Sequence, residues 1–279
     1  MGSFAYYNGK YGSREEITVP LSDRALFFGD GVYDAAVGKD GKIFLVEEHI
    51  NRLLGNANKL NINHVLSYEK ILDILTECVR LSGIESFFLY FQLTRNSKKR
   101  THSALGCDGA NFLVTVDEFA LPDPEKRISL ITADDLRYYY CDVKTINLLP
   151  GVIASTKAEE AGAYEAVFLR GDTVTECAHS NVSILKDGVL YTHPTNNLIL
   201  PGITRKHLLM ACKALGIEYK EIPFTKNELF SADEIIVTST SKLCLFAEKI
   251  DGISVGGKDW QRAKALSDFM IDEFVHYYL

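Results

Sequence analysis

Apolar residues recur with helical or strand spacing through the first 120 residues. Positions 47–60 have helical spacing, and apolar side chains recur on one helical face from Tyr68 to Val79, with Gly83 as a stop signal. The runs 87–94 and 111–116 are rich in aromatic and β-branched residues, which favour strands. The first part of the chain therefore combines helices with sheet.

The second part repeats this mixture. Helical spacing covers 152–161, 204–215 and 262–277, and strand patterns cover 166–169, 182–186, 189–192 and 234–238. Asp187 and Gly188 stand between two of these strands and predict a hairpin. Because strands often follow one another directly, the pattern predicts mixed or antiparallel sheets in an α+β (mixed α/β) fold.

A break in the pattern divides the chain near residue 120. The segment 121–127 contains two of the seven prolines together with several charges, and it separates two apolar runs. Proline supplies no backbone donor and restricts the residue before it, so this segment predicts a linker. We therefore expect a smaller N-terminal α/β domain at 1–120 and a larger C-terminal domain at 128–279.

Composition narrows the class of protein. Hydrophobic residues make up 47% of the chain, and 30 Lys and Arg against 37 Asp and Glu give a net charge of −7. This acidic balance argues against nucleic-acid binding. No apolar run reaches the roughly 20 residues that span a bilayer, and the N-terminal segment lacks signal-peptide features. We expect a soluble, cytoplasmic protein without nucleic-acid or membrane partners.

The cysteines and the known metal motifs give no sign of a metal site. The six cysteines stand singly, without a Cys-x-x-Cys pair, and His-Glu-x-x-His is absent from the sequence. We expect most of the cysteines to be reduced residues within the core.

Two segments have the composition of phosphate sites. Pro201 and Gly202 end an extended run before Thr204, which could cap the following helix, and a helix start can bind phosphate. Residues 237–241 cluster hydroxyl groups after an apolar strand. From the pattern alone, a capped helix and a Ser/Thr turn are the favoured interpretations of these two segments.

Two ionisable residues have ambiguous settings. Glu176 is either a solvated loop acid or a buried carboxylate facing a ring nitrogen. Lys144 lies in a largely apolar run, where it either reaches solvent or acts as an amine nucleophile that forms a Schiff base with an aldehyde. Periodicity does not choose between these alternatives.

Taken in order, several segments resemble the class IV aminotransferases, the fold-type IV enzymes that use pyridoxal 5'-phosphate. The resemblance is greatest to the bacterial D-amino acid aminotransferases. It implies two domains with the cofactor between them, and it makes residues 128–279 the cofactor-binding domain. It is carried by residues 23–24, 29–33, 48–53, 90–95, 141–149, 191–194, 202–205 and 237–240.

The resemblance gives these residues roles. Lys144 matches the Schiff-base lysine, which also moves the substrate proton, and Glu176 matches the acid that pairs with the pyridine nitrogen. Arg137 matches an arginine near the ring, and Leu200 matches an apolar residue that supports it. The residues that match the phosphate site are Arg52, Ile203, Thr204, Ser239 and Thr240.

The resemblance also implies how the substrate is bound. Arg100 and His102 match a pair that holds the substrate carboxylate, and Tyr33 matches a tyrosine that the other subunit contributes, so a homodimer is implied. Without the family context, residues 98–100 are simply a solvated basic run. Three features depart from the family pattern: His179, Ser183 and the loop at 96–99.

The implied reaction is transamination between a D-amino acid, such as D-alanine, and a 2-oxo acid, such as 2-oxoglutarate or pyruvate. Branched-chain L-amino acid aminotransferases and aminodeoxychorismate lyases share the motifs around Lys144 and Glu176, although the Arg100–His102 pair argues against both. An alternative of another class is a protein that binds the cofactor without catalysis.

Overall fold

A computed structural model describes residues 3–120, 123 and 125–278 of the chain. These residues form two compact units, the first consisting of residues up to 120 with 143–147 and Tyr278, and the second of the remainder. Of the predicted linker 121–127, residues 121, 122 and 124 lie outside the described residues. The segment 143–147, which carries Lys144, packs with the first unit although it lies in the range expected for the C-terminal domain.

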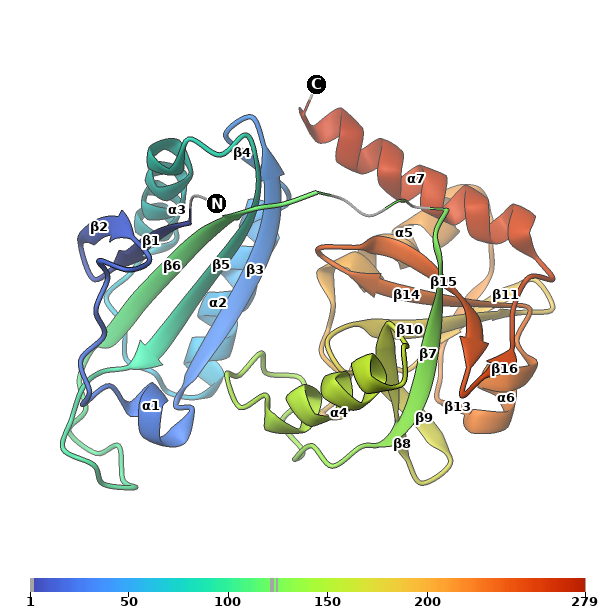
Figure 1. Cartoon of the computed structure of the whole chain (residues 1–279), viewed down its shortest axis with the longest axis horizontal. Helices are drawn as coiled ribbons and strands as arrows, with labels where there is room; N and C mark the ends of the chain where they lie inside the picture. Colours follow the sequence, from blue (N-terminus) through green and yellow to red (C-terminus); the bar gives the residue numbers. More distant parts are fainter. Residues whose placement is uncertain (1–2, 121–122, 124, 279) are drawn as a thin grey trace. The chain divides into compact units, whose positions relative to one another are not determined.

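The first unit is built on one sheet with the strand order β2-β1-β6-β5-β3-β4, and each neighbouring pair is antiparallel (Figure 1). Its strands are β1 (Phe4–Tyr7), β2 (Lys10–Ser13), β3 (Gly31–Lys39), β4 (Lys42–Ile43), β5 (Ser86–Arg95) and β6 (Ala110–Glu118). Its helices are α1 (Arg24–Phe28), α2 (Val46–Lys59) and α3 (Tyr68–Ser82).

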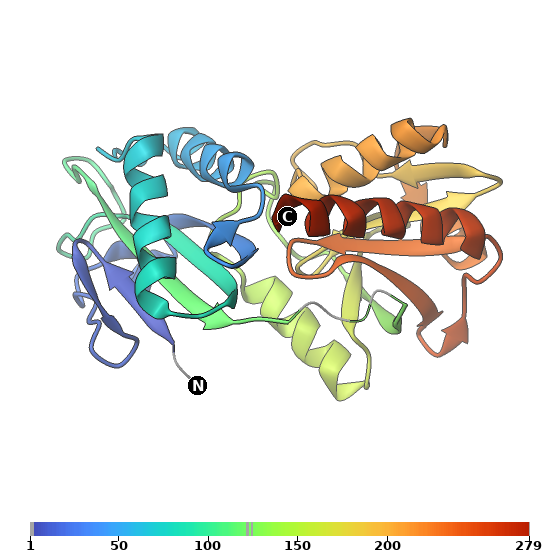
Figure 2. The same cartoon turned by 90° about the horizontal axis from the view of Figure 1, so that it is seen from above.

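Helices α2 and α3 cover one face of this sheet (Figure 2). Ile50, Leu53 and Ala57 recur at helical spacing on α2 and are fully buried in the core with the inner face of β5. Helix α3 begins at a Ser67 cap and ends at Gly83, whose φ of 66° is a left-handed conformation that suits glycine. Helices therefore pack against the sheet behind β3.

The second unit contains a ten-stranded mixed sheet with the order β12-β11-β10-β14-β15-β7-β8-β9-β13, with β16 paired to β15. Strand β7 runs parallel to both β15 and β8. The strands of this sheet are β7 (Arg127–Asp134), β8 (Glu165–Arg170), β9 (Thr173–Cys177), β10 (Asn181–Lys186), β11 (Val189–Thr192), β12 (Tyr219–Glu221), β13 (Phe224–Thr225), β14 (Glu234–Ser239), β15 (Leu243–Ile250) and β16 (Ile253–Ser254).

Four helices belong to the second unit, namely α4 (Leu149–Glu160), α5 (Ile203–Leu215), α6 (Lys226–Ser231) and α7 (Trp260–Tyr278), whose residue Tyr278 packs with the first unit. Helices α5 and α7 share a core with β14 and β15, while α4 packs on β8 through a separate small cluster (Figures 1 and 2). None of the helices that the structure describes is long and apolar enough to cross a membrane.

The structure confirms the predicted mixture of helices and mixed or antiparallel sheets. Asp187 and Gly188 form the β10–β11 turn with φ values of 50° and 77°, as the hairpin prediction required. Five cysteines are buried and Cys141 is partly buried, all with free thiols. The expectation that Thr204 caps α5 is wrong, because the backbone is still extended at Gly202 and the helix begins at Ile203.

Candidate functional site

Lys144 lies against β3 in the first unit. The Tyr33 amide donates to the Lys144 carbonyl at 2.9 Å, and the Ile146 amide donates to the Gly31 carbonyl at 3.2 Å. These bonds place the Lys144 Nζ 4.4 Å from the centre of the Tyr33 ring, which itself stacks on Tyr90. The lysine is partly buried, so its amine lies on an aromatic face instead of extending freely into solvent.

The neighbouring residue on β3, Asp34, binds Arg52 and His49. The Asp34 carboxylate is fully buried and accepts bonds from Arg52 Nε and Nη2 at 2.7 and 2.8 Å. It lies 2.7 Å from His49 Nδ1, which donates to it. The three side chains come from β3 and from successive turns of α2, so the hydrophobic packing of that helix also sets the position of the guanidinium.

The charges in this cluster fix its protonation state. Burial alone would raise the pKa of Asp34, but the charge and hydrogen bonds of Arg52, and then those of His49, hold it well below its usual range. Burial lowers the pKa of His49 although Asp34 opposes this, and the charges of Arg52 and Lys144 act in the same direction as burial. Asp34 is therefore anionic and His49 neutral near pH 7.

The predicted substrate-binding residues Arg100 and His102 lie on the loop after β5. Arg24 donates to the backbone carbonyls of Thr101 and His102 at 2.7 and 3.1 Å. The ring of Phe28 faces the Arg100 guanidinium at 5.3 Å and the His102 ring at 5.4 Å.

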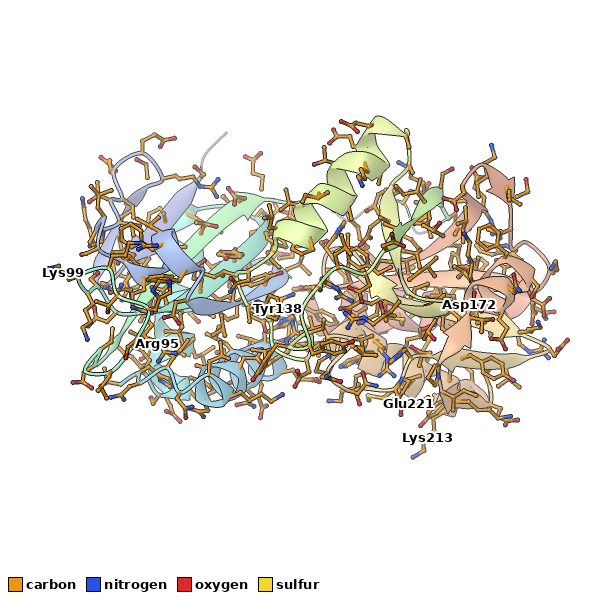
Figure 3. All side chains as sticks on the ribbon, turned by 90° about the horizontal axis from the view of Figure 1, so that it is seen from below. Arg95, Lys99, Tyr138, Asp172, Lys213 and Glu221 are labelled. Atoms are coloured by element: carbon orange, nitrogen blue, oxygen red, sulfur yellow. The ribbon has the colours of Figure 1, made fainter. Side chains whose placement is uncertain are left out.

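Figure 3 shows Lys99 at the outer edge of this loop. Among the described residues, neither Arg100 nor His102 has a hydrogen bond or ring contact with Tyr33 of the same chain. The structure therefore places the predicted pair on an exposed loop and does not bring it to Tyr33.

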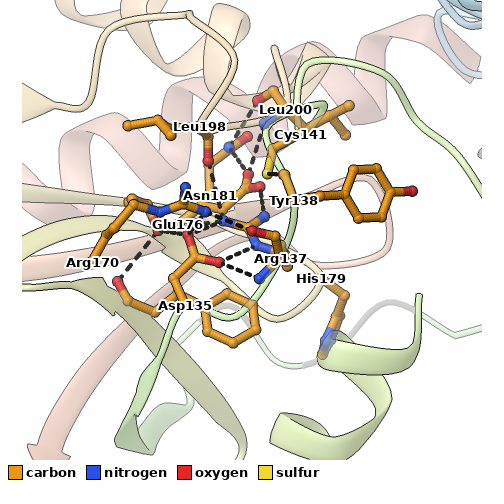
Figure 4. A network of polar contacts seen from close by, with 12 residues as sticks. Asp135, Arg137, Tyr138, Cys141, Arg170, Glu176, His179, Asn181, Leu198 and Leu200 are labelled. Carbon is orange, nitrogen blue, oxygen red and sulfur yellow. Dashed lines mark hydrogen bonds and ion pairs between the residues drawn. The ribbon is translucent and has the colours of Figure 1, made fainter. Parts of the chain in front are cut away.

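In the second unit, Glu176 is a buried carboxylate on β9, which excludes the solvated loop acid (Figure 4). One oxygen accepts a bond from Arg137 Nη1, and the other accepts from Asn181 Nδ2 at 2.9 Å and from the Leu200 amide at 3.0 Å. Arg137 is in turn held by Asp135 through Nε and Nη2, both at 2.9 Å. The structure thus brings together Arg137, Glu176 and Leu200, three of the predicted site residues.

The start of α5 is joined to this carboxylate through Asn181. Its amide nitrogen also donates to the Leu200 carbonyl at 3.0 Å, and its oxygen lies 2.0 Å from where a Cβ on Gly202 would stand. Only glycine fits so close an approach. Gly202 leaves α5 without a side-chain cap, and Ile203 and Thr204 form its first turn. The amides of a first turn have no partner within their helix and favour an anion.

A buried hydroxyl without a partner supports an anion site at this edge. Asn181 pairs with Thr238 across β10 and β14, so the next residue, Ser239, lies at the end of the same strand pair. The Ser239 Oγ is buried and has no hydrogen-bond partner among the described residues. Such a group is costly to bury unless a ligand or water binds it. With Thr240 directly following, the donors here suit a phosphate group.

His179 and Ser183, the two departures from the family pattern in this unit, have different environments. His179 is half-exposed, and both its amide and its Nδ1 contact the buried Glu165 carboxylate, at 2.7 and 3.0 Å. Burial raises the pKa of Glu165 although His179 opposes this. Ser183 is fully buried on β10.

Sequence reasoning missed Asp34, Asp135 and Asn181. A single carboxylate inside the apolar run 32–37 was the available signal for Asp34. No sequence motif marks Asp135 or Asn181, because their contacts form only when the chain folds.

Comparison with known proteins identifies the family of the chain. The family model described as amino-transferase class IV matches residues 31–250. The chain therefore belongs to the class IV aminotransferase family. This confirms the resemblance found in the sequence and, with it, the fold-type IV class.

Named relatives cover most of this class IV aminotransferase. The D-alanine aminotransferase of Bacillus licheniformis is 40% identical over 90% of this chain and 89% of its own length. That of Staphylococcus haemolyticus is 38% identical over 90% of each chain. A branched-chain amino acid aminotransferase from T.th., solved with pyridoxamine 5'-phosphate, has a TM-score of 0.90 at 24% identity and covers 98% of this chain and 94% of its own.

The ionised state of Asp34 leads to a stability prediction. Because its pKa in the folded protein lies below the ordinary value of about 3.9, its contribution is present above that value and is lost as the pH falls below it. The free energy of unfolding of the wild type should therefore begin to fall near pH 5 and continue to fall as the pH is lowered to about 2, toward the folded pKa. In Asp34→Asn this fall should be smaller, and the variant should be less stable by about 3 kcal/mol at pH 7, because it leaves the Arg52 charge without its anion.

Chemical denaturation at several pH values measures both effects. Asp117→Asn is the matched control, since Asp117 pairs with Arg14 on the exposed surface and should keep the wild-type pH dependence. An unchanged pH dependence in Asp34→Asn would contradict the assignment of charge to this cluster.

Proposed function

We propose that this class IV aminotransferase binds pyridoxal 5'-phosphate and transfers amino groups between a D-amino acid and a 2-oxo acid. The observation that carries the proposal is the buried Glu176 carboxylate, joined through Asn181 to the first turn of α5. One unit thereby holds an anion that suits a protonated ring nitrogen and, beside it, donors that suit a phosphate.

Different residues of the chain hold the cofactor and move the substrate proton in this proposal. The cofactor, when bound, supplies an aldehyde and an electron-accepting ring. Lys144 would hold the cofactor through its amine, and the same amine would carry the substrate Cα proton. Glu176 holds a proton on the ring nitrogen. Ile203, Thr204, Ser239 and Thr240 would bind the phosphate together with Arg52, whose guanidinium is oriented by Asp34, and Leu200 and Arg137 would border the ring.

The D-amino acid specificity rests on relatives and on the loop after β5. Proteins named D-alanine aminotransferase are 37–40% identical to this chain over about nine-tenths of its length or more. Arg100 and His102 provide a guanidinium and an imidazole, which suit a carboxylate. D-alanine is then the amino donor, and 2-oxoglutarate or pyruvate is the acceptor.

A homodimer completes the substrate site in this proposal. Arg100 and His102 have no hydrogen bond or ring contact with Tyr33 among the described residues of one chain, which is the arrangement expected if Tyr33 serves the pair of another subunit. Large apolar side chains are also exposed in each unit, as subunit interfaces require. They include Leu26 and Phe27 in the first unit and Leu136, Tyr138, Tyr139, Tyr140, Leu148 and Leu149 in the second.

We place the enzyme in the cytoplasm, because its six free thiols suit a reducing compartment.

The second candidate is a branched-chain L-amino acid aminotransferase. Solved structures with that name share the fold at TM-scores up to 0.90, but at identities of 21–25%. The same fold would serve an aminodeoxychorismate lyase or a protein that binds the cofactor without catalysis.

A half-reaction separates these functions. The holoenzyme is mixed with D-alanine, L-valine or aminodeoxychorismate, and the absorbance of the bound cofactor is followed. We expect rapid conversion to the amine form with D-alanine and conversion at least about 100-fold slower with L-valine, because amino acids of opposite configuration at Cα place their carboxylates differently. Lys144→Ala should lose at least about 1,000-fold in turnover, since it lacks both the amine and the proton carrier.

Rapid conversion with L-valine and none with D-alanine would overturn the proposed substrate. A Lys144→Ala variant with full turnover, or a purified protein that binds no cofactor, would overturn the proposed chemistry.

The carboxylate-binding role of Arg100 has its own test. Arg100→Gln removes the charge and should raise KM for both D-alanine and the 2-oxo acid about 10- to 100-fold, corresponding to the roughly 1.5–3 kcal/mol of a charge-assisted hydrogen bond. Lys99→Gln is the matched control, because it removes a neighbouring positive charge and should leave KM within about twofold. Equal KM changes in the two variants would show that Arg100 acts only through the general basic character of the loop.

A further inference from the structure

Four charged side chains alternate in sign behind the Glu176 carboxylate: Arg170, Asp135, Arg137 and Glu176 (Figure 4). They come from β8, from the segment after β7 and from β9, so they all belong to the second unit. Two cations and two carboxylates make the chain of charges neutral as a whole. The role proposed above uses only Glu176 and, at the border of the ring, Arg137, and leaves Asp135 and Arg170 without a function.

Asp135 is the most enclosed member of this group. Its side chain is fully buried, and it accepts bonds from Arg137 Nε and Nη2 at 2.9 Å and from Thr175 Oγ1 at 3.0 Å. Arg170 Nη2 approaches the same carboxylate at 3.2 Å. Burial alone would raise the pKa of Asp135, but the hydrogen bonds and charge of Arg137 lower it, so the carboxylate is anionic.

Arg137 divides its donors between two carboxylates. Asp135 occupies the edge formed by Nε and Nη2, while Nη1 donates to Glu176. The guanidinium carbon also lies 4.7 Å over the Phe168 ring, and Nη2 donates to the Leu198 carbonyl at 3.1 Å. Because a planar guanidinium held side-on by a carboxylate has most of its charge offset, Glu176 faces an ion pair instead of an isolated cation.

This offset determines how strongly Glu176 attracts a second cation. A carboxylate beside an uncompensated guanidinium in a buried site has its own charge neutralised and holds a further positive partner less well. A carboxylate beside a compensated guanidinium keeps that attraction. The charge on Asp135 therefore acts on Glu176 through Arg137.

We infer that Asp135 is a positioning residue that offsets the charge of Arg137, so that Glu176 keeps a proton on the pyridine nitrogen of the cofactor. The inference rests on the proposed function, because it requires bound pyridoxal 5'-phosphate. It assigns Asp135 no contact with substrate or cofactor, and it predicts a change in the protonation of the ring instead of a general loss of structure.

Arg170 provides a test with the opposite sign. It lies against the Asp135 oxygen that also accepts from Arg137, so it competes for the same negative charge. Removing the Arg170 charge should leave Asp135 more fully available to Arg137. Replacing Asp135 and replacing Arg170 should therefore change the protonation of the ring nitrogen in different ways, although both break the same ion pair.

The experiment uses holoenzyme loaded with pyridoxal 5'-phosphate that carries 15N at the ring nitrogen. The 15N chemical shift reports directly whether that nitrogen is protonated, and it is followed as a function of pH without substrate. In the wild type the resonance should lie at the protonated position. In Asp135→Asn it should move toward the unprotonated position, with the nitrogen's pKa lower by about 1 to 2, as expected for an uncompensated charge a few ångströms away.

Three further variants identify the cause. Asp135→Glu keeps the charge and should restore at least part of the wild-type shift, and Arg170→Gln should not lower the nitrogen's pKa. Asp251→Asn is the matched control, since Asp251 binds Thr132 on the exposed surface of the same unit and should behave like the wild type.

The outcomes separate the inference from the proposed function. A wild-type protein that binds no cofactor, or whose ring nitrogen is unprotonated, would contradict the proposed function itself. A protonated wild type with an unchanged resonance in Asp135→Asn, or an equal fall in Arg170→Gln, would overturn the inference alone. If Asp135→Asn loses its cofactor, Arg137→Gln decides: without the guanidinium the nitrogen should stay protonated, and loss of its proton would overturn the inference.

Discussion

Both units depend on the same interaction, in which a buried carboxylate accepts two hydrogen bonds from one edge of an arginine guanidinium. Asp34 holds Arg52 in the first unit, and Asp135 holds Arg137 in the second, each through Nε and Nη2 of the guanidinium. Neither carboxylate is exposed to solvent. A charge in such a place is tolerated only when it is paired and hydrogen-bonded, so each pair is fixed in geometry by the cost of separating it.

These pairs link the fold to the chemistry. In the first unit, Asp34 follows Tyr33, whose amide binds the Lys144 carbonyl, so one short stretch of β3 orders both the arginine and the lysine. In the second unit, Glu176 receives Arg137 on one oxygen and Asn181 and the Leu200 amide on the other. The ionised groups of these clusters thus come from β3, β9 and α2 and from the segment after β7.

Local patterns were sufficient to predict much of the fold. The sequence predicted α2, α3, β5 and β6 to within a few residues of their bounds. The spacing of their apolar residues marks the face that each element packs against the core. The family resemblance, and not periodicity, connected Lys144 with Glu176. The sequence pattern gave no reason to expect that residues 143–147 pack beside β3, because this depends on hydrogen bonds between segments more than 100 residues apart.

The roles of the buried acids were equally hidden. Asp135 looks like any polar residue after a strand, and its function follows only from the arginines that folding brings to it. Thr204 is a residue type that commonly caps helices, yet α5 already begins at Ile203, with Gly202 in the cap position, where Asn181 leaves no room for a side chain. In both cases a contact made by another segment decides what a residue does.

In the proposed function Lys144 carries the cofactor, and borohydride reduction of the holoenzyme shows which lysine does so. Reduction fixes the cofactor to its lysine, and trypsin does not cleave after the modified residue. Mass spectrometry should therefore find the phosphopyridoxyl group on Lys144, in a peptide that continues from Tyr138 to Lys157. A label on a different lysine, or no label on a protein that binds the cofactor, would show that Lys144 does not carry it.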